Sequence, residues 1–230
     1  YQPIVDIARR EIFAHEALVR GIHGESALSV LGHVNADNRY LFDQTCREKA
    51  ISLAAKLQLS SKLSINFLPN AIYQPELCIR STLIAAQKHE VPLSSIIFEA
   101  VEGEMIADGP RLAEILRAYQ QIGFLTAIDD FGAGYAGLNL LADFQPDIVK
   151  LDMGLIRAID TSKARQAIVK ALIAMTDELE IRVIAEGVET VAEAQCLEQM
   201  GIRLMQGFAF SRPLFERFAK PENIVWSTRD

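Results

Sequence analysis

The sequence predicts an α/β protein, a TIM-like (β/α)8 barrel in which one strand runs antiparallel. Two observations carry this prediction. Short apolar runs alternate with longer amphipathic runs along nearly the whole chain, as in a parallel sheet built from βα units. Polar and mostly ionisable residues also stand at the end of each apolar run after the first, and a closed barrel gathers such residues at one mouth.

The elements follow in order along the chain. Only the Ala8-Arg9-Arg10 turn separates the first two apolar runs, so we expect a hairpin there and one antiparallel strand. The predicted strands are Tyr1 to Ile7, Glu11 to Arg20, Leu63 to Phe67, Ile96 to Ala100, Leu125 to Asp129, Ile148 to Leu151, Arg182 to Ala185 and Leu204 to Gln206. The predicted helices are at about 38–58, 76–89, 108–122, 134–143, 162–179 and 190–200.

Composition narrows the class of protein. The 230 residues are half hydrophobic and contain no linker-like stretch, which favours a single domain over 1–230, with a core over 1–213 and a tail over 214–230. A net charge of −7 argues against binding of a nucleic acid polymer through phosphate contacts. The three cysteines lie far apart, which fits a reducing, cytoplasmic compartment and no zinc site.

Targeting signals are not apparent in the chain. No apolar run approaches the ~18 residues that cross a bilayer, and no signal-peptide pattern opens the sequence. The chain begins with Tyr1 and not with Met, so we expect it to be a piece of a larger multidomain protein. That parent protein would carry a membrane anchor or an upstream sensory domain.

Seven predicted strands have polar and mostly ionisable residues at their carboxyl ends. Because the carboxyl ends of barrel strands ring one mouth, we expect their polar side chains to converge there. The residues at these ends are Glu16, Asn66, Glu99, Asp129 with Asp130, Lys150 with Asp152, Glu186 and Gln206.

The stretch from 124 to 138 admits three interpretations, and it reads FLTAIDDFGAGYAGL. Its glycines at 132, 134 and 137, with Asp152 further on, fit the spacing of a dinucleotide-binding loop. Asp129 and Asp130 would then repel the pyrophosphate, so we discard that interpretation. The DFG letters resemble a kinase motif, but no HRDxxxxN or VAIK segment accompanies them. The third interpretation is a metal site.

A metal site explains why two adjacent carboxylates end a buried strand. Cations neutralise such a pair, whereas without them one carboxyl retains its proton. The oxygen ligands available, with no imidazole or thiolate among them, favour Mg²⁺ or Mn²⁺. Two such ions form a known device for phosphoester cleavage, with Asp129 as the bridging ligand and Asp130 on the second ion. Lys150 is placed to contact the attacking water or a phosphate oxygen, and Arg20 to pair with a phosphate.

At this point the sequence resembles the EAL-domain phosphodiesterases, which hydrolyse cyclic di-GMP to linear 5'-pGpG. The motifs stand in family order from residue 1 to 213 and read YQPIVD, EALVR, INFLPN, FEAVE, DDFGAGY, VKLD, AEGVET and QGFAFSRP. The resemblance implies an EAL-type TIM-like barrel with an antiparallel first strand. It also implies a homodimer formed near the loop after Asp130.

The resemblance assigns roles to residues of this chain. It implies that one metal ion is held by Glu16, Asn66, Glu99 and Asp129, and the second by Asp129, Asp130 and Glu186. Further implied catalytic residues are Lys150 and Glu186 at the water, Asp152 and Glu189 in support, and Glu102 as anchor of the loop from Asp129. The implied substrate contacts are Gln2, Leu18, Arg20, Gln206 and Pro213. Ca²⁺ is expected to inhibit, because its longer bonds misplace the water.

Two departures from the family pattern leave an alternative open. The usual Ser-Ser after the loop tyrosine is Ala136-Gly137 here, and the usual Thr before Glu102 is Val101. The alternative is a catalytically silent EAL module that binds cyclic di-GMP or a protein partner as a sensor. His15 alternates away from Glu16, so we expect it to pack or to meet solvent.

Overall fold

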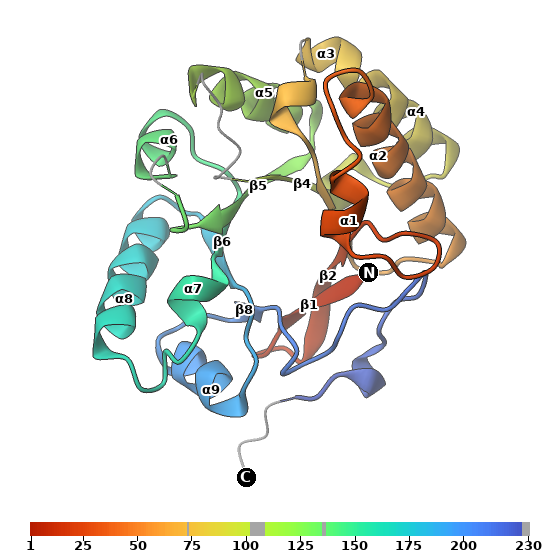
Figure 1. Cartoon of the computed structure of the whole chain (residues 1–230). Helices are drawn as coiled ribbons and strands as arrows, with labels where there is room; N and C mark the ends of the chain where they lie inside the picture. The colour runs from red at the N-terminus through yellow and green to blue at the C-terminus, as the bar shows by residue number, and fades with distance from the viewer. Residues whose placement is uncertain (73, 102–108, 135–136, 227–230) are drawn as a thin grey trace.

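Eight strands close into a barrel, each pairing with the next along the chain and the last with the first (Figure 1). The computed structural model describes residues 1–72, 74–101, 109–134 and 137–226. The strands are β1 (Gln2–Asp6), β2 (Glu11–Ala17), β3 (Lys62–Asn66), β4 (Ile96–Val101), β5 (Leu125–Phe131), β6 (Ile148–Leu151), β7 (Arg182–Ala185) and β8 (Leu204–Met205). This closure confirms the predicted fold class and excludes the open sheet of a dinucleotide-binding fold.

The first strand runs against its neighbours. β1 pairs antiparallel with both β2 and β8, whereas every other pair in the barrel is parallel. The predicted hairpin is therefore confirmed. The prediction placed the end of the second strand at Arg20, which is wrong by three residues. β2 stops at Ala17 because its last partner on β3 is Ile65, and beyond that pair no neighbouring strand extends the ladder.

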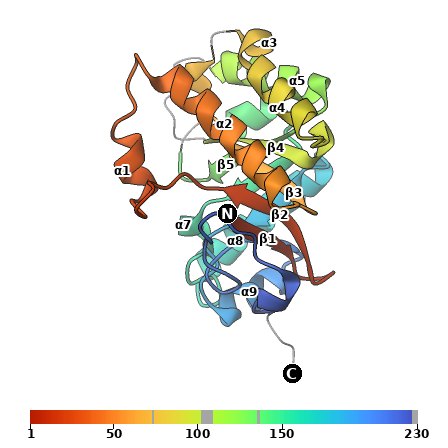
Figure 2. The same cartoon turned by 90° about the vertical axis from the view of Figure 1, so that its right-hand side faces the viewer.

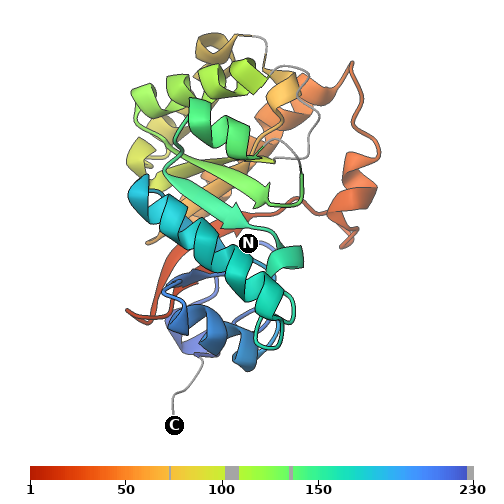
Figure 3. The same cartoon turned by 90° about the vertical axis from the view of Figure 1, so that its left-hand side faces the viewer.

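Helices surround the barrel and cover its outer face (Figures 1 and 3). They are α1 (Ala27–Leu31), α2 (Arg39–Lys56), α3 (Pro75–Cys78), α4 (Arg80–Lys88), α5 (Gly109–Ile122), α6 (Gly137–Asp143), α7 (Met153–Ile156), α8 (Lys163–Glu178) and α9 (Val191–Gln199). Three short 3-10 turns are η1 (Pro69–Ala71), η2 (Leu93–Ser95) and η3 (Pro221–Asn223). Within the described ranges, none of these helices has both the length and the apolar character that crossing a bilayer requires.

The helix predicted at 76–89 is in fact two helices. A turn at Ile79 ends α3 and precedes α4, and the Ile79 side chain is buried in the core. The sequence also gave no sign of α1 or α7, because helices of four or five residues are too short to show a period. All three cysteines are free thiols, as their spacing predicted.

Apolar side chains fill the barrel below its mouth. They form a cluster separate from the larger core between barrel wall and helices. We call this cluster the barrel plug, and it consists of Ile4, Ala14, Ile97, Ala127, Ile148, Ile184 and Leu204. Each of these side chains is at most 8% exposed, so the lower half of the barrel is filled by buried apolar side chains.

The segment after residue 213 covers the outer face of the β1–β2 hairpin, which has no crossover helix of its own (Figure 2). Leu214 N donates to Tyr1 O at 2.8 Å, so the chain's two ends are joined by backbone pairing. The Phe218 ring lies 4.5 Å from the rings of both Tyr1 and His15, centroid to centroid. This segment therefore completes the core on the side of the β1–β2 hairpin.

His15 is expected to make the fold lose stability in acid. Its ring is buried between Ser61 Oγ at 2.9 Å and Ala219 O at 3.2 Å, and burial lowers its pKa from 6.5 to about 4. The unfolded chain therefore binds a proton that the folded chain resists, and His15 costs stability as the pH falls from about 6.5 towards 4. The full loss is on the order of 3 kcal/mol.

The measurement compares the free energy of unfolding of the wild type and of His15→Gln between pH 7 and pH 4.5. Because glutamine does not titrate in this range, the free energy of unfolding of the wild type should fall relative to that of His15→Gln as the pH falls. A gap that stays constant across the range would contradict the assignment.

Candidate metal centre

Polar residues form a layer directly above the barrel plug. Side chains alternate along a strand, so the residue two positions nearer the mouth points into the same interior. On seven strands that residue follows a plug residue, and on β3 it follows the buried Ser64. The resulting layer is Gln2, Glu16, Asn66, Glu99, Asp129, Lys150, Glu186 and Gln206, all of them predicted site residues.

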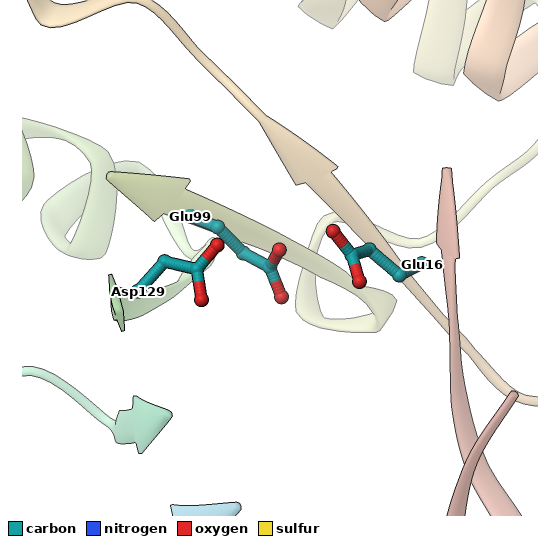
Figure 4. Close-up of side chains that lie close together, drawn as sticks. All are labelled: Glu16, Glu99 and Asp129. Atoms are coloured by element: carbon teal, nitrogen blue, oxygen red, sulfur yellow. The ribbon is translucent and has the colours of Figure 1, made fainter. Parts of the chain in front are cut away.

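Three of these carboxylates from three different strands face one another. Glu16 on β2, Glu99 on β4 and Asp129 on β5 each offer an oxygen, and these oxygens lie within 4.8 Å of one another (Figure 4). A second group with the same property consists of Asp129, Asp130 and Glu186. Asp129 belongs to both groups, as expected for a ligand shared by two neighbouring cations.

Lys150 lies at the centre of the layer. Its ammonium is fully buried and contacts four carboxylates: Glu186 Oε1 at 2.6 Å, Glu99 Oε2 at 2.9 Å, Asp129 Oδ1 at 3.1 Å and Glu16 Oε2 at 3.7 Å. One ammonium faces five carboxylates once Asp130 is included. The layer is therefore short of positive charge, and this deficit favours either retained protons or bound cations.

Neutral donors orient the carboxylates from the side. Glu16 accepts hydrogen bonds from Asn66 Nδ2 at 2.8 Å and from Gln206 Nε2 at 2.7 Å. Ser64 Oγ donates to Glu99 Oε1, the oxygen that Lys150 does not contact. Sequence reasoning missed Ser64, although its position two residues before Asn66 on the same strand places it on the same face.

A β-bulge explains how two adjacent aspartates serve one site. Between Ile128 and Phe131, β5 spans three residue steps while its partner β6 spans only two, from Val149 to Leu151. Asp130 accommodates the extra residue with φ of +54°, a left-handed conformation that aspartate tolerates better than most residues. Without the bulge, neighbouring side chains would point to opposite faces of the strand.

Electrostatics in the layer reflect the shortage of cations. Burial raises the pKa of Glu99 to about 8 and holds that of Glu186 well above its usual value, although Lys150 acts against both shifts. Burial together with the charge of Asp129 raises the pKa of Asp130 to about 6. Burial also acts to raise the pKa of Asp129, but the Lys150 ammonium and nearby hydrogen bonds outweigh it, so this pKa is lowered.

The donor set fits divalent cations with hard oxygen ligands. Two overlapping groups of three carboxylate oxygens, with the Asn66 amide beside them and no thiolate or imidazole in either group, match the preferences of Mg²⁺ and Mn²⁺. Either cation would also remove the charge deficit that otherwise keeps protons on Glu99 and Glu186.

Two predicted supporting residues lie outside these groups. Asp152 accepts from Gly154 N at 2.8 Å and so caps the start of α7. The Glu189 side chain is 45% exposed and pairs with Arg157 at 3.3 Å. In the described part of the chain neither carboxylate contacts the polar layer. Glu102, the predicted loop anchor, and Ala136 fall outside the described residues.

The predicted substrate contacts surround the mouth at different depths. Gln2 is buried opposite Glu16 in the β1–β2 ladder, and its amide donates to Ser211 O at 3.4 Å. Leu18 and Pro213 are half-buried in the segments that follow β2 and β8. Arg20 is exposed, and its guanidinium donates to Val19 O at 2.7 Å.

Comparison with solved structures finds a similar barrel in two bacterial proteins. A standalone EAL protein of Vibrio cholerae with cyclic di-GMP bound is 56% identical, with a TM-score of 0.93 over 96% of this chain and 94% of that one. BlrP1 of Klebsiella pneumoniae, in a manganese and cyclic di-GMP complex, is 38% identical, with a TM-score of 0.88 over 94% of this chain and 55% of that one.

Comparison with characterised proteins gives relatives that differ in described activity. The antirepressor BluF of Escherichia coli, regulated by blue light and temperature, is 35% identical over 92% of this chain and 53% of its own length. The cyclic di-GMP phosphodiesterase NbdA of Pseudomonas aeruginosa is 28% identical over 93% of this chain and 28% of its own. This chain therefore spans about half or less of the length of these relatives. The model of the EAL domain matches residues 1–213, and the chain belongs to the EAL domain family.

Proposed function

We propose that this chain hydrolyses cyclic di-GMP to linear 5'-pGpG with the help of two divalent cations, Mg²⁺ or Mn²⁺. The observation that carries the proposal is the pair of three-carboxylate groups that share Asp129 at the mouth of the barrel. The cyclic di-GMP found in the Vibrio and Klebsiella relatives, and the manganese in the latter, support the same substrate and cofactor for this chain.

We assign each residue of the polar layer to one of the two cation positions or to the attacking water. Glu16, Asn66, Glu99 and Asp129 would hold one ion, and Asp129, Asp130 and Glu186 the other. When bound, such a pair of ions lowers the pKa of a water and offsets the charge of the attacked phosphoryl group. Lys150 Nζ would orient that water towards the phosphorus, and Glu186, 2.6 Å from Nζ, would accept its proton while the P–O bond to the ribose 3'-oxygen breaks and that oxygen takes up a proton. The supporting roles that the family resemblance implies for Asp152, Glu189 and Glu102 stay predictions, since Asp152 caps α7 and Glu189 pairs with Arg157 at 3.3 Å.

The substrate would be held from the opposite side of the mouth. Arg20, exposed just beyond β2, pairs with a phosphate through its planar guanidinium. Gln2 and Gln206 present amides at the depth of the carboxylates, and Leu18 and Pro213 supply apolar contact beside them. The homodimer, the cytoplasmic location and an upstream sensory or GGDEF-type domain belong to the same proposal and stay predictions.

Turnover should require a small divalent cation. The purified chain is incubated with cyclic di-GMP and Mg²⁺, then with EDTA, then with Ca²⁺ alone, and pGpG is measured by chromatography. We expect product with Mg²⁺, none with EDTA, and little with Ca²⁺, because its longer and looser coordination places the water poorly. Undiminished turnover in calcium alone, or any turnover in EDTA, would sink the two-metal proposal.

A silent binding module is the second candidate, and the relative BluF, described as an antirepressor, favours it. Ala136-Gly137 in place of the usual loop serines points the same way. This candidate predicts binding of cyclic di-GMP without product under the Mg²⁺ conditions above. Product in Mg²⁺ separates the two candidates, because only the enzyme forms pGpG there. Calorimetry with the nucleotide in Ca²⁺ then shows whether a chain that forms no product still binds cyclic di-GMP.

A further inference from the structure

A buried ion pair lies behind the wall of the barrel, away from the polar layer. Asp43 and Arg47 stand one turn apart on α2, which packs along β3 (Figure 2), and their side chains are 1% and 0% exposed. Burying an ion pair costs several kcal/mol per charge, by order of magnitude, and an apolar pair of similar volume often stabilises a fold equally well. Arg47 Nε finds no partner among the described residues, so the pair is not optimised for stability alone.

The Arg47 guanidinium is enclosed by three aromatic rings. Its central carbon lies 5.3 Å from the ring centroid of Phe98, 5.7 Å from that of Phe67 and 5.9 Å from that of Tyr119. It also donates to the Tyr119 hydroxyl at 3.2 Å. Contacts of this kind between a desolvated guanidinium and ring faces are strongly favourable. The rings are thereby held in one arrangement against α2.

Two of these rings are chain neighbours of proposed metal ligands. Phe67 directly follows Asn66, and Phe98 directly precedes Glu99. Asn66 and Glu99 are themselves opposite each other in the β3–β4 ladder. Because adjacent side chains leave a strand on opposite faces, holding the rings outside the barrel also sets how the two ligands project into it.

Asp43 also contacts the backbone just beyond β3. Its Oδ1 accepts from Leu68 N at 2.9 Å, while its Oδ2 accepts from Arg47. Leu68 lies two residues beyond Asn66, where β3 has already ended, and the neighbouring Phe67 N donates to Glu99 O of β4 at 3.1 Å. The carboxylate therefore fixes the exit of β3 at the level of the ligand.

We propose that the Asp43–Arg47 pair is a positioning device that sets the affinity of the site for divalent cations through Asn66 and Glu99. This inference rests on the proposed function. Groups that orient metal ligands from behind typically change affinity by about 10- to 100-fold when removed. A pair that only fastened α2 to the barrel would change the stability of the fold and leave cation affinity untouched.

The test replaces the pair together, as Asp43→Leu with Arg47→Met, and measures Mn²⁺ binding by calorimetry and electron paramagnetic resonance. An apolar pair keeps the fold near wild-type stability but removes the acceptor for Leu68 N and the cation between the rings. We expect Mn²⁺ to bind about 10-fold more weakly or worse, with a melting temperature close to that of the wild type. Val169→Ala, fully buried in α8 against a different part of the barrel, is the matched control: it lowers stability and leaves Mn²⁺ affinity unchanged.

Each result has one meaning. A pair variant that binds Mn²⁺ as the wild type does overturns this inference alone. A wild type that binds no Mn²⁺ overturns the proposed function and this inference with it. Should the pair variant not fold, Arg47→Lys replaces it: lysine keeps the charge beside Asp43 but not the flat contact with the rings, so affinity should fall several-fold, and unchanged affinity overturns the inference.

Discussion

Replacing Asp129 by asparagine should reduce turnover of cyclic di-GMP by about 10³-fold or more. Asp129 belongs to both three-carboxylate groups, so its loss weakens both cation positions at once. Cations at such sites contribute several kcal/mol of charge stabilisation, and each ~1.4 kcal/mol corresponds to a factor of ten in rate. Asparagine has nearly the same shape, so the substitution removes charge without opening a cavity.

Mn²⁺ titration of the same variant should show weaker binding at both positions. Asp160→Asn serves as the control, because Asp160 is exposed on the turn that follows α7 and loses the same formal charge. If Asp129→Asn retains wild-type turnover, the bridging assignment is wrong, whatever the titration shows.

Replacing Lys150 by methionine should destabilise the cation-free protein by about 3–5 kcal/mol, the usual cost of removing one partner from a buried ion network. The variant leaves four carboxylates without the ammonium that lies within 3.7 Å of each of them. Excess Mn²⁺ should restore much of the loss, because a ligand that binds only the folded state stabilises it by about 2.7 kcal/mol at 100 times its Kd. Turnover should stay low even so, since the group that we propose to orient the water is missing.

Melting curves in EDTA and in Mn²⁺ measure this effect, with exposed Lys170→Met on α8 as the control. The deficit in EDTA should also shrink as the pH falls. Burial already raises the pKa of Glu99 and of Glu186, and both values rise further once the ammonium is gone, so protons replace it at higher pH than in the wild type. A variant as stable as the wild type in EDTA at neutral pH would show that Lys150 does not hold the layer together.

Much of the site could be predicted because strands repeat every two residues. Ile97 and Glu99, or Ile148 and Lys150, show the rule: an apolar residue deep in the barrel is followed by a polar one at the mouth. The β1–β2 hairpin could also be predicted, since three residues between two apolar runs leave no room for a helix. Local patterns of this kind suffice wherever one strand and its neighbours decide the outcome.

Other features depend on contacts that no local pattern reveals. The bulge at Asp130 arises from the register between β5 and β6, and aspartate in that conformation looks like any other aspartate in the sequence. Asp43 and Arg47 have the spacing of an ordinary surface pair on a helix. Their burial follows from contacts with Phe67, which directly follows β3, and with Phe98 on β4, both of them outside the helix. The short α1 and α7 have no period to detect.

The barrel plug closes the interior below the polar layer, so the site opens only at the mouth of the barrel. Ile4, Ile148 and Ile184 seal the floor beneath the carboxylates, so nothing passes through the barrel from below. Under the proposed function, cyclic di-GMP would enter and the linear product would leave through this one opening. Because substrate and product would occupy the same site at this mouth, accumulated linear product is expected to compete with cyclic di-GMP for it.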